Sequence, residues 1–249
     1  MRSAGIDIGS RSIKLIVLEG EEIVESRKAD TGHDPLAEAE RLLDGVYYDN
    51  IMATGYGRNL FDNRFKAPTV TEIKAHGTGA KALFPKAKAV LDIGGQDSKA
   101  ILLDHSGKVV KFEMNDRCAA GTGKFLEIMA RTLGYTIDEF GSDSLTAVKD
   151  IKINSMCTVF AESEAVSLVA KGEARREIAR GLHVSIAKRS AGMLQRLSAC
   201  GPILFSGGVA NNPCMCILIK DILKEKLVIP EKPEMVGALG AAILASSHH

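Results

Sequence analysis

Apolar positions at the start of the chain come in short alternating runs typical of β-strands. They predict a three-stranded antiparallel meander over residues 3–9, 12–19 and 22–29. The step Glu19-Gly20-Glu21 is typical of a tight turn between the last two of these strands. The same pattern returns later and predicts a second meander over residues 87–93, 98–104 and 108–114.

Helical periodicity separates and follows the two meanders. Asp34-Pro35 provides an N-cap and a first-turn proline, and the apolar residues that follow recur on one face of a helix. A short strand over Ile51–Thr54 leads into the glycine-punctuated loop Gly55–Arg58, and a helix is expected over Glu72–Leu83. From residue 118 to 199 helices dominate.

The remaining elements are a strand at 202–205, a helix, a short strand near Val228 and a small-residue helix at 236–245. Strands followed by helices thus recur as two related halves, which indicates an internal duplication with a cleft between the halves. We expect one subdomain at 1–68, completed by the C-terminal helix at 236–249, and a second at 69–235. Gly237, Ala238, Gly240 and Ala241 permit that last helix to pack closely on the first half.

Two similar turns, Asp7-Ile8-Gly9-Ser10 and Asp92-Ile93-Gly94-Gly95, end the first strand of each meander. Glycine lets the backbone approach a phosphate closely, turn N–H groups can face the anion, and an aspartate at the strand end can hold Mg²⁺. Each aspartate alone also fits a plain turn former. The duplication, together with Gly207-Gly208 in a later strand-end turn, favours a nucleotide held from both sides.

Other polar residues near these turns are candidates for the same site. Lys14 faces away from the apolar side of its strand and is either a phosphate ligand or a solvated surface lysine. Gln96 and Asp97 extend the second turn and could orient water or a metal ion. The segment Gly121–Lys124 is not a P-loop, because the first glycine and the final Ser/Thr of that motif are missing.

Composition restricts the class of protein. The chain has 249 residues, enough for one large or two small domains, and 32 basic residues against 31 acidic ones give no reason to propose nucleic acid as a partner. Apolar runs are strand-sized and no secretory signal is evident, so we expect a cytoplasmic protein that does not bind membranes. The ending Ser246–His249 resembles the start of a purification tag, and its histidines are given no function.

The cysteines lie at 118, 157, 200, 214 and 216, all in the second half. No Cys-x-x-Cys pair exists, and in a cytosolic chain a disulfide framework is not expected. Cys118 and Cys157 each follow a polar stretch and are expected at or just before the start of a helix, where free N–H groups favour a thiolate. Two thiolates are half of a four-ligand set, which a dimer axis would complete. Cys200, Cys214 and Cys216 are expected to be buried and inert.

These motifs resemble a known family, the ATP-dependent activators (component A) of 2-hydroxyacyl-CoA dehydratases, which are related to benzoyl-CoA reductase ATPase subunits. The resemblance covers essentially the whole chain. It rests on the segments Asp7–Lys14, Gly55–Arg58, Asp92–Asp97, Cys118–Gly123, Cys157–Glu162 and Gly207–Val209. The two Asp-Gly turns alone resemble the wider actin, Hsp70 and sugar-kinase superfamily, so the resemblance implies a duplicated α/β actin-like ATPase (ribonuclease H-like) fold.

The resemblance also implies a function. It implies a homodimer with one [4Fe-4S] cluster on its axis, held by Cys118 and Cys157 of each subunit, and ATP or ADP with Mg²⁺ in each cleft. Such a protein is an ATPase coupled to electron transfer. It receives an electron from ferredoxin or flavodoxin and injects it at low potential into an iron–sulfur dehydratase or a double-cubane cluster reductase. Nothing in the chain identifies the partner's substrate.

The site residues that the resemblance implies match motif positions of this chain. We further expect Asp7 and Asp92 to act through Mg²⁺, by way of water, with Gln96 near the γ-phosphate. The residues expected to contact nucleotide are Ser10, Arg11, Ser12, Lys14, Gly94, Gly95, Gln96, Gly207 and Gly208, with Glu234 near the adenine.

A small-molecule kinase of the sugar-kinase type is the main alternative. It explains both Asp-Gly turns and Gly207-Gly208, but it leaves the two cysteine motifs without a role. A filament-forming, actin-like protein is disfavoured because the chain is short and lacks added subdomains.

Overall fold

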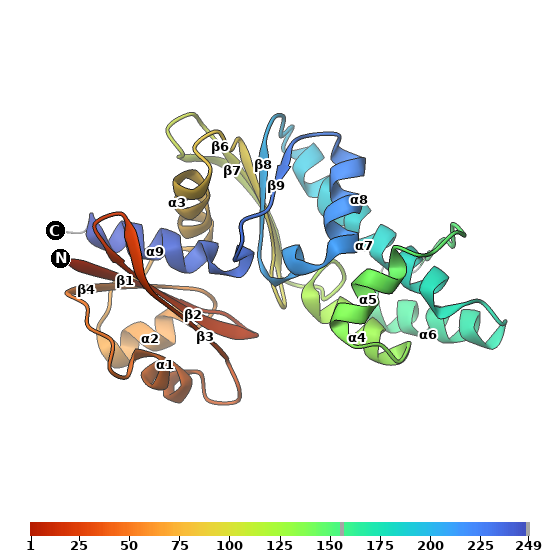
Figure 1. The fold of residues 1–249 in the computed structure, drawn as a ribbon, viewed down its shortest axis with the longest axis horizontal. Helices are drawn as coiled ribbons and strands as arrows, with labels where there is room; N and C mark the ends of the chain where they lie inside the picture. Colours follow the sequence, from red (N-terminus) through yellow and green to blue (C-terminus); the bar gives the residue numbers. More distant parts are fainter. Residues whose placement is uncertain (155–156, 248–249) are drawn as a thin grey trace.

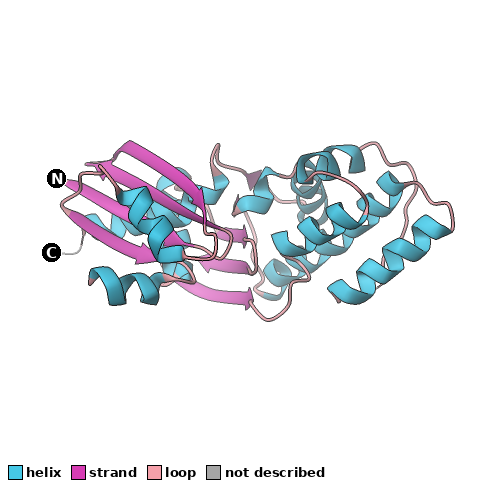
Figure 2. Ribbon diagram, turned by 90° about the horizontal axis from the view of Figure 1, so that it is seen from below, coloured by secondary structure: helices cyan, strands magenta, loops and turns pink. Residues whose placement is uncertain are grey.

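The computed structural model describes residues 1–154 and 157–247 and contains two mixed β-sheets with helices packed around them (Figures 1 and 2). Ser155 and Met156, part of the polar stretch ahead of Cys157, lie outside the described residues, as do His248 and His249 of the expected tag.

The first sheet has the strand order β3-β2-β1-β4. The antiparallel meander predicted from the sequence is confirmed as β1 (Arg2–Ile8), β2 (Ser12–Glu19) and β3 (Glu22–Asp30). The strand β4 (Asn50–Thr54) runs parallel to β1. Two helices, α1 (Pro35–Leu43) and α2 (Arg58–Phe65), bury apolar side chains against this sheet.

The second sheet has the order β7-β6-β5-β8-β9 and repeats the plan of the first. The second predicted meander is confirmed as β5 (Ala89–Ile93), β6 (Ser98–Leu103) and β7 (Val109–Asn115). Two parallel strands, β8 (Ile203–Ser206) and β9 (Leu227–Val228), extend the sheet beyond β5. In both sheets the Asp-Gly turn therefore joins the central strand to its antiparallel neighbour.

The helix expected after residue 71 is α3 (Glu72–Leu83). The helical region expected from residue 118 onward resolves into α4 (Gly123–Thr132), α5 (Ile137–Ser144), α6 (Thr158–Ala170) and α7 (Arg175–Arg196). The other elements are α8 (Pro213–Leu223), α9 (Val236–Ser246) and the 3-10 turns η1 (Gly208–Asn211) and η2 (Pro233–Met235). Among the described residues, no helix combines the length and apolar character needed to cross a lipid bilayer.

The helix α2 was not expected, because the sequence predicted only a loop around Gly55–Arg58. Its composition is polar and only weakly amphipathic, and Phe61 is its one buried residue. The Phe61 ring stacks on Phe65 at 4.3 Å between centroids. The two rings are four residues apart on one face of α2, and their packing against the core of the first sheet stabilises the helix.

The last helix, α9, joins the two halves, and Figure 1 shows it lying between β1 and α3. Glycine makes both contacts possible. A Cβ on Gly5 of β1 would overlap the backbone of Ala238, and a Cβ on Gly240 would overlap the carbonyl oxygen of Ala75 in α3. The small-residue pattern of the final helix is therefore used for close backbone packing, as expected from its sequence.

A second buried connection joins the helical half to the wall of the cleft. His183 of α7 is fully buried; its Nδ1 donates to the Ala179 carbonyl (2.8 Å), and its Nε2 accepts from Asn212 Nδ2 (3.0 Å). Asn212 also caps α8 by accepting from Met215 N (3.0 Å). These partners require a neutral ring, and burial lowers the pKa of His183 to about 4.

Gly240→Ala will lower the free energy of unfolding by about 2 kcal/mol or more, because the added methyl group overlaps a packed backbone carbonyl. Urea denaturation measures this. Gly192→Ala in α7 is the matched control, since its Cβ meets only the flexible end of Arg196, at 3.3 Å. Equal effects of the two substitutions would contradict the close-packing argument.

His183 will make the folded protein acid-sensitive. Between pH 6.5 and about 4, the His183 ring is protonated in the unfolded chain and neutral in the folded chain. Its contribution to the free energy of unfolding is therefore complete above pH 6.5 and is lost as the pH falls through this range. The contribution is about 3 kcal/mol. Between pH 7 and pH 4, His183→Gln should lose less free energy of unfolding than the wild type, by about this amount. His33→Gln, which changes an exposed histidine, should lose as much as the wild type. Equal pH dependence in wild type and His183→Gln would refute the assignment.

Candidate functional site

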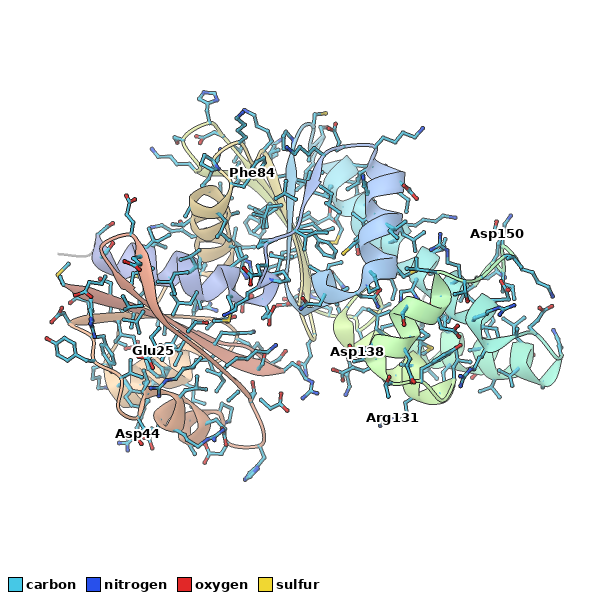
Figure 3. All side chains as sticks on the ribbon, in the orientation of Figure 1. Glu25, Asp44, Phe84, Arg131, Asp138 and Asp150 are labelled. Atoms are coloured by element: carbon cyan, nitrogen blue, oxygen red, sulfur yellow. The ribbon has the colours of Figure 1, made fainter. Side chains whose placement is uncertain are left out.

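A cleft of about 800 Å³ lies between the two sheets and opens at their Asp-Gly turns. Asp138, labelled in Figure 3, marks its helical side. Every cleft residue predicted from the sequence lines it. These are Asp7, Ser10, Arg11, Ser12, Lys14, Asp92, Gly94, Gly95, Gln96, Gly207, Gly208 and Glu234.

The first turn presents one acid and one base to the cleft. Asp7 ends β1 and lies opposite Lys14 in the β1–β2 register, and Lys14 Nζ is 3.1 Å from Asp7 Oδ2. Both side chains are mostly buried, at 13% exposure for Lys14 and 10% for Asp7. Lys14 is therefore not a solvated surface lysine, and its ammonium group borders the cleft.

The second turn is closed by a bond from Gly94 N to the Asp97 carbonyl (2.9 Å). Its own carbonyls face α4, because Gly94 O accepts from Gly123 N (2.9 Å) and Gly95 O accepts from Lys124 N (2.8 Å). Two of the N–H groups that a helix start leaves without intrahelical partners are thus satisfied by the turn. The start of α4 is tethered directly to the floor of the cleft.

A largely buried charge cluster lines the cleft beside the second turn. Lys99, opposite Asp92 in the β5–β6 register, is 2% exposed, and its Nζ lies 2.7 Å from Glu72, 2.8 Å from Asp97 and 3.2 Å from Asp92. Asp92 Oδ1 also accepts from Ser206 Oγ (3.0 Å) and lies 3.5 Å from His76 Nδ1.

The charges in this cluster stabilise one another. Burial alone would raise the pKa of Asp92, but His76, Lys99 and Ser206 outweigh it and hold that pKa at about 2. Burial opposes the charge on Lys99 as well, yet the surrounding carboxylates raise its pKa above the ordinary value. The pKa of Glu72 is raised, first by burial and then by the neighbouring Asp97 and Asp7 charges, against the opposing effect of Lys99. Lys99 and Asp92 are therefore ionised at neutral pH.

The third glycine turn forms the opposite wall. Gly207 has a φ of +84°, and a Cβ there would overlap the Ile93 carbonyl, so only glycine fits between β8 and η1. Glu234 of η2 pairs with Lys28 of β3 (2.9 Å) and accepts from Asn211 (3.3 Å). The Lys28–Glu234 pair bridges the first sheet and the far wall of the cleft.

Cys118 and Cys157 lie outside the cleft, on the helical side of the molecule. Cys157 is exposed and is the N-cap of α6, as predicted. The expected placement of Cys118 at the start of α4 is wrong, because α4 begins at Gly123. Cys118 lies in the preceding loop, where Asn115 Nδ2 donates to the carbonyls of Cys118 (2.9 Å) and Ala120 (3.0 Å). The first N–H groups of α4 are used by the second turn, so they do not serve Cys118.

The other three cysteines differ from one another. Cys214 is fully buried, and burial raises the pKa of its thiol; burial likewise raises the pKa of Cys216 to about 11. The expected burial is therefore confirmed for Cys214, whereas Cys216 is only partly buried. Cys200 is exposed, contrary to expectation, because it lies in the loop between α7 and β8.

Apart from Asp92 and Asp97, the members of the buried charge cluster were not predicted from the sequence. A signal for Lys99 was present, since an aspartate and a lysine seven residues apart occur in both hairpins, as Asp7/Lys14 and Asp92/Lys99. No comparable signal marks Glu72, His76 and Ser206, which reach the cluster from α3 and β8. Their approach depends on tertiary structure.

The described residues do not form a complete metal site within one chain. Among residues 1–154 and 157–247, no group of three or more His, Cys, Asp or Glu side chains is arranged to hold a metal ion. A cation in the cleft would therefore need ligands from water or a bound molecule. Carboxylates do exceed ammonium groups there, and oxygen donors suit Mg²⁺.

Comparison with known proteins places the chain in a family. Residues 4–245 match the model of the BadF/BadG/BcrA/BcrD ATPase family. The activator of lactoyl-CoA dehydratase from Anaerotignum propionicum is 40% identical over 255 residues, covering 98% of this chain and 97% of the relative.

Solved structures agree. The activator of the 2-hydroxyisocaproyl-CoA dehydratase from Clostridium difficile, with bound ADPNP, superposes with a TM-score of 0.91 at 35% identity and covers 99% of this chain and 95% of its own. A ROK family glucokinase from Streptomyces griseus superposes at a TM-score of 0.62 and 13% identity, covering 99% and 100%, which shows a shared fold only. The chain therefore has the actin-like ATPase fold and belongs to the BadF/BadG/BcrA/BcrD ATPase family, among homologues named activators of 2-hydroxyacyl-CoA dehydratases.

Proposed function

We propose that this protein is an ATP-hydrolysing activator that, as a homodimer carrying one [4Fe-4S] cluster, delivers a low-potential electron to a partner iron–sulfur enzyme. The partner class is a 2-hydroxyacyl-CoA dehydratase or a related double-cubane cluster reductase, and ferredoxin or flavodoxin supplies the electron. The observation that carries the proposal is the pair of backbone hydrogen bonds from Gly123 and Lys124 to the second turn. They connect the cleft to the segment that bears Cys118.

In the cleft, the two turns hold the phosphates of ATP or ADP. The residues proposed to contact nucleotide are Ser10, Arg11, Ser12, Lys14, Gly94, Gly95, Gln96, Gly207 and Gly208, with Glu234 on the adenine side. Asp7 and Asp92, which both line the cleft, would hold Mg²⁺ through water, and the ion would supply positive charge to the phosphates. The γ-phosphate lies at Gln96, which orients the attacking water.

The donor set of Cys118 and Cys157 suits a soft iron–sulfur cluster, and one chain supplies only two thiolates. When bound, the cluster stores and releases one electron. A second copy of the chain completes the set across a two-fold axis. The helix that begins at Cys157 supports this arrangement, because its exposed side chains include Val159, Phe160, Val166 and Val169. Burying such apolar side chains in a dimer is favourable.

Coupling follows from the tethers of α4. Hydrolysis changes the charge and contacts at the second turn, and the carbonyls of Gly94 and Gly95 carry any movement into α4. The helix α4 packs beside α6 (Figure 1), and Thr132 donates to Glu162 (3.0 Å). A nucleotide-dependent shift of the turn therefore reaches both cysteine-bearing segments. ATP needs only to bind two conformations with different affinity to drive it.

Cys118→Ser and Cys157→Ser will each abolish iron binding. Anaerobically purified wild type should contain about two irons per chain, because a four-iron cluster is shared by two chains. Iron analysis and the visible spectrum measure this. Cys200→Ser, which changes an exposed thiol, is the matched control and should retain the iron. Iron retained in both Cys118→Ser and Cys157→Ser would refute the cluster assignment.

Gln96→Ala will lower the ATPase rate by about 100-fold, because the attacking water loses the group that orients it. The rate is measured with the cluster intact. Gln195→Ala on the exposed side of α7 should leave the rate unchanged. An unchanged rate in Gln96→Ala would remove Gln96 from the mechanism.

A further inference from the structure

One buried ammonium group ties together three separate segments beside the cleft. Lys99 Nζ lies between Glu72, the first residue of α3, Asp92 at the end of β5, and Asp97 at the far side of the second turn. All three N···O distances are 3.2 Å or less. The lysine itself is 2% exposed. Its three protons therefore already have carboxylate partners.

The corresponding lysine of the first hairpin has a different environment. Lys14 occupies the same register position relative to Asp7, yet it has a single carboxylate partner and is 13% exposed. It can turn toward a phosphate by giving up one contact. Lys99 would have to leave three carboxylates in a buried site, which is costly. The duplicated lysines have thus taken different roles.

The partners of Lys99 lie at structurally important points. Glu72 follows the segment that crosses between the halves, where Ala53 N donates to Pro68 O and Val70 N donates to Ala53 O, both at 2.9 Å. Asp97 closes the second turn through its carbonyl, and Gln96 precedes it. Lys99 therefore fixes the turn, and with it Gln96, relative to the crossover between the halves.

We propose that Lys99 is a positioning residue for ATP hydrolysis that makes no contact with phosphate. It holds Asp97, and with it Gln96, at a fixed position relative to Glu72 and the segment that crosses between the halves. The inference rests on the proposed ATPase activity. Without the ammonium group, Glu72, Asp92 and Asp97 repel one another, and the turn moves away from α3. Lys14 and the glycine turns still bind the nucleotide. The loss should therefore appear in kcat and not in ATP affinity.

The test compares Lys99→Met with Lys14→Met in the iron-loaded protein. Rates are expressed per ATP-binding site, counted with ADPNP, so that a smaller folded fraction does not mimic a slower reaction. For Lys99→Met, kcat should fall by about 100-fold with KM within about threefold, as expected for misplaced catalytic groups. For Lys14→Met, ATP affinity should fall by about 10-fold or more through loss of a charged contact. Lys111→Met, on the exposed face of β7, should match wild type.

Two further variants test the inference even if Lys99→Met folds poorly. Glu72→Gln keeps Lys99 paired with both aspartates, and kcat should fall by about 5- to 10-fold with ATP affinity unchanged. The double variant Lys99→Met/Glu72→Gln should be more stable than Lys99→Met alone, because it buries one uncompensated carboxylate fewer.

Different results would contradict the role of Lys99 and the proposed function. Weakened ATP binding in Lys99→Met, as in Lys14→Met, would make Lys99 a phosphate ligand and overturn the inference. Wild-type kcat in Lys99→Met, or in Glu72→Gln if Lys99→Met does not fold, would also overturn it. Absence of ATP binding and hydrolysis in the wild-type protein would instead defeat the proposed function on which the inference rests.

Discussion

The second turn, from Asp92 to Asp97, makes polar contacts with two different parts of the molecule, the start of α4 and the side chain of Lys99. Its carbonyls at Gly94 and Gly95 accept the first N–H groups of α4, while its carboxylates at Asp92 and Asp97 surround Lys99. Because both sets of contacts are buried or directly bonded, the turn cannot shift without disturbing one of them. The connection between the cleft and the segments that bear Cys118 and Cys157 depends on this constraint.

The duplicated hairpins differ in the side chains around their Asp–Lys pair. In the first hairpin, Asp7 and Lys14 form a single pair beside the cleft, and the turn carbonyl of Ile8 accepts from the N-cap of α2, Gly57 N (2.9 Å). The second hairpin keeps the same Asp–Lys register and adds Glu72, His76 and Ser206 around it. The additional partners come from α3 and β8, which the second half places against its hairpin. Lys14 thus has one carboxylate partner beside the cleft, whereas Lys99 is held by several side chains of the second half.

The sequence predicted the parts of the fold that local pattern controls. Alternating apolar residues located both meanders, and the repeated Asp-Gly turns located the cleft, so every proposed cleft residue lines it. The loop before α4 was missed because Asn115 holds Cys118 through a contact that spacing does not encode. The helix α2 was missed because its sequence is mostly polar, and packing of Phe61 and Phe65 against the core of the first sheet stabilises it. Cys200 was misjudged because residue type alone does not tell a loop thiol from a core thiol.

Cys118 and Cys157 have different positions relative to the helices that follow them, so the proposed coupling reaches each cysteine in a different way. Cys157 is the N-cap of α6, so it lies next to the partial positive charge of that helix end. Cys118 is separated from α4 by a loop, and the N–H groups of Gly123 and Lys124 already bond to the second turn. The dipole of α4 is therefore directed at the nucleotide cleft. In the proposed coupling, a change at the second turn would act on Cys118 by displacing α4 and the loop that Asn115 anchors to the end of β7. Since β7 belongs to the same sheet as the turn, the loop is attached at both ends to elements that border the cleft, and the proposed coupling uses both attachments.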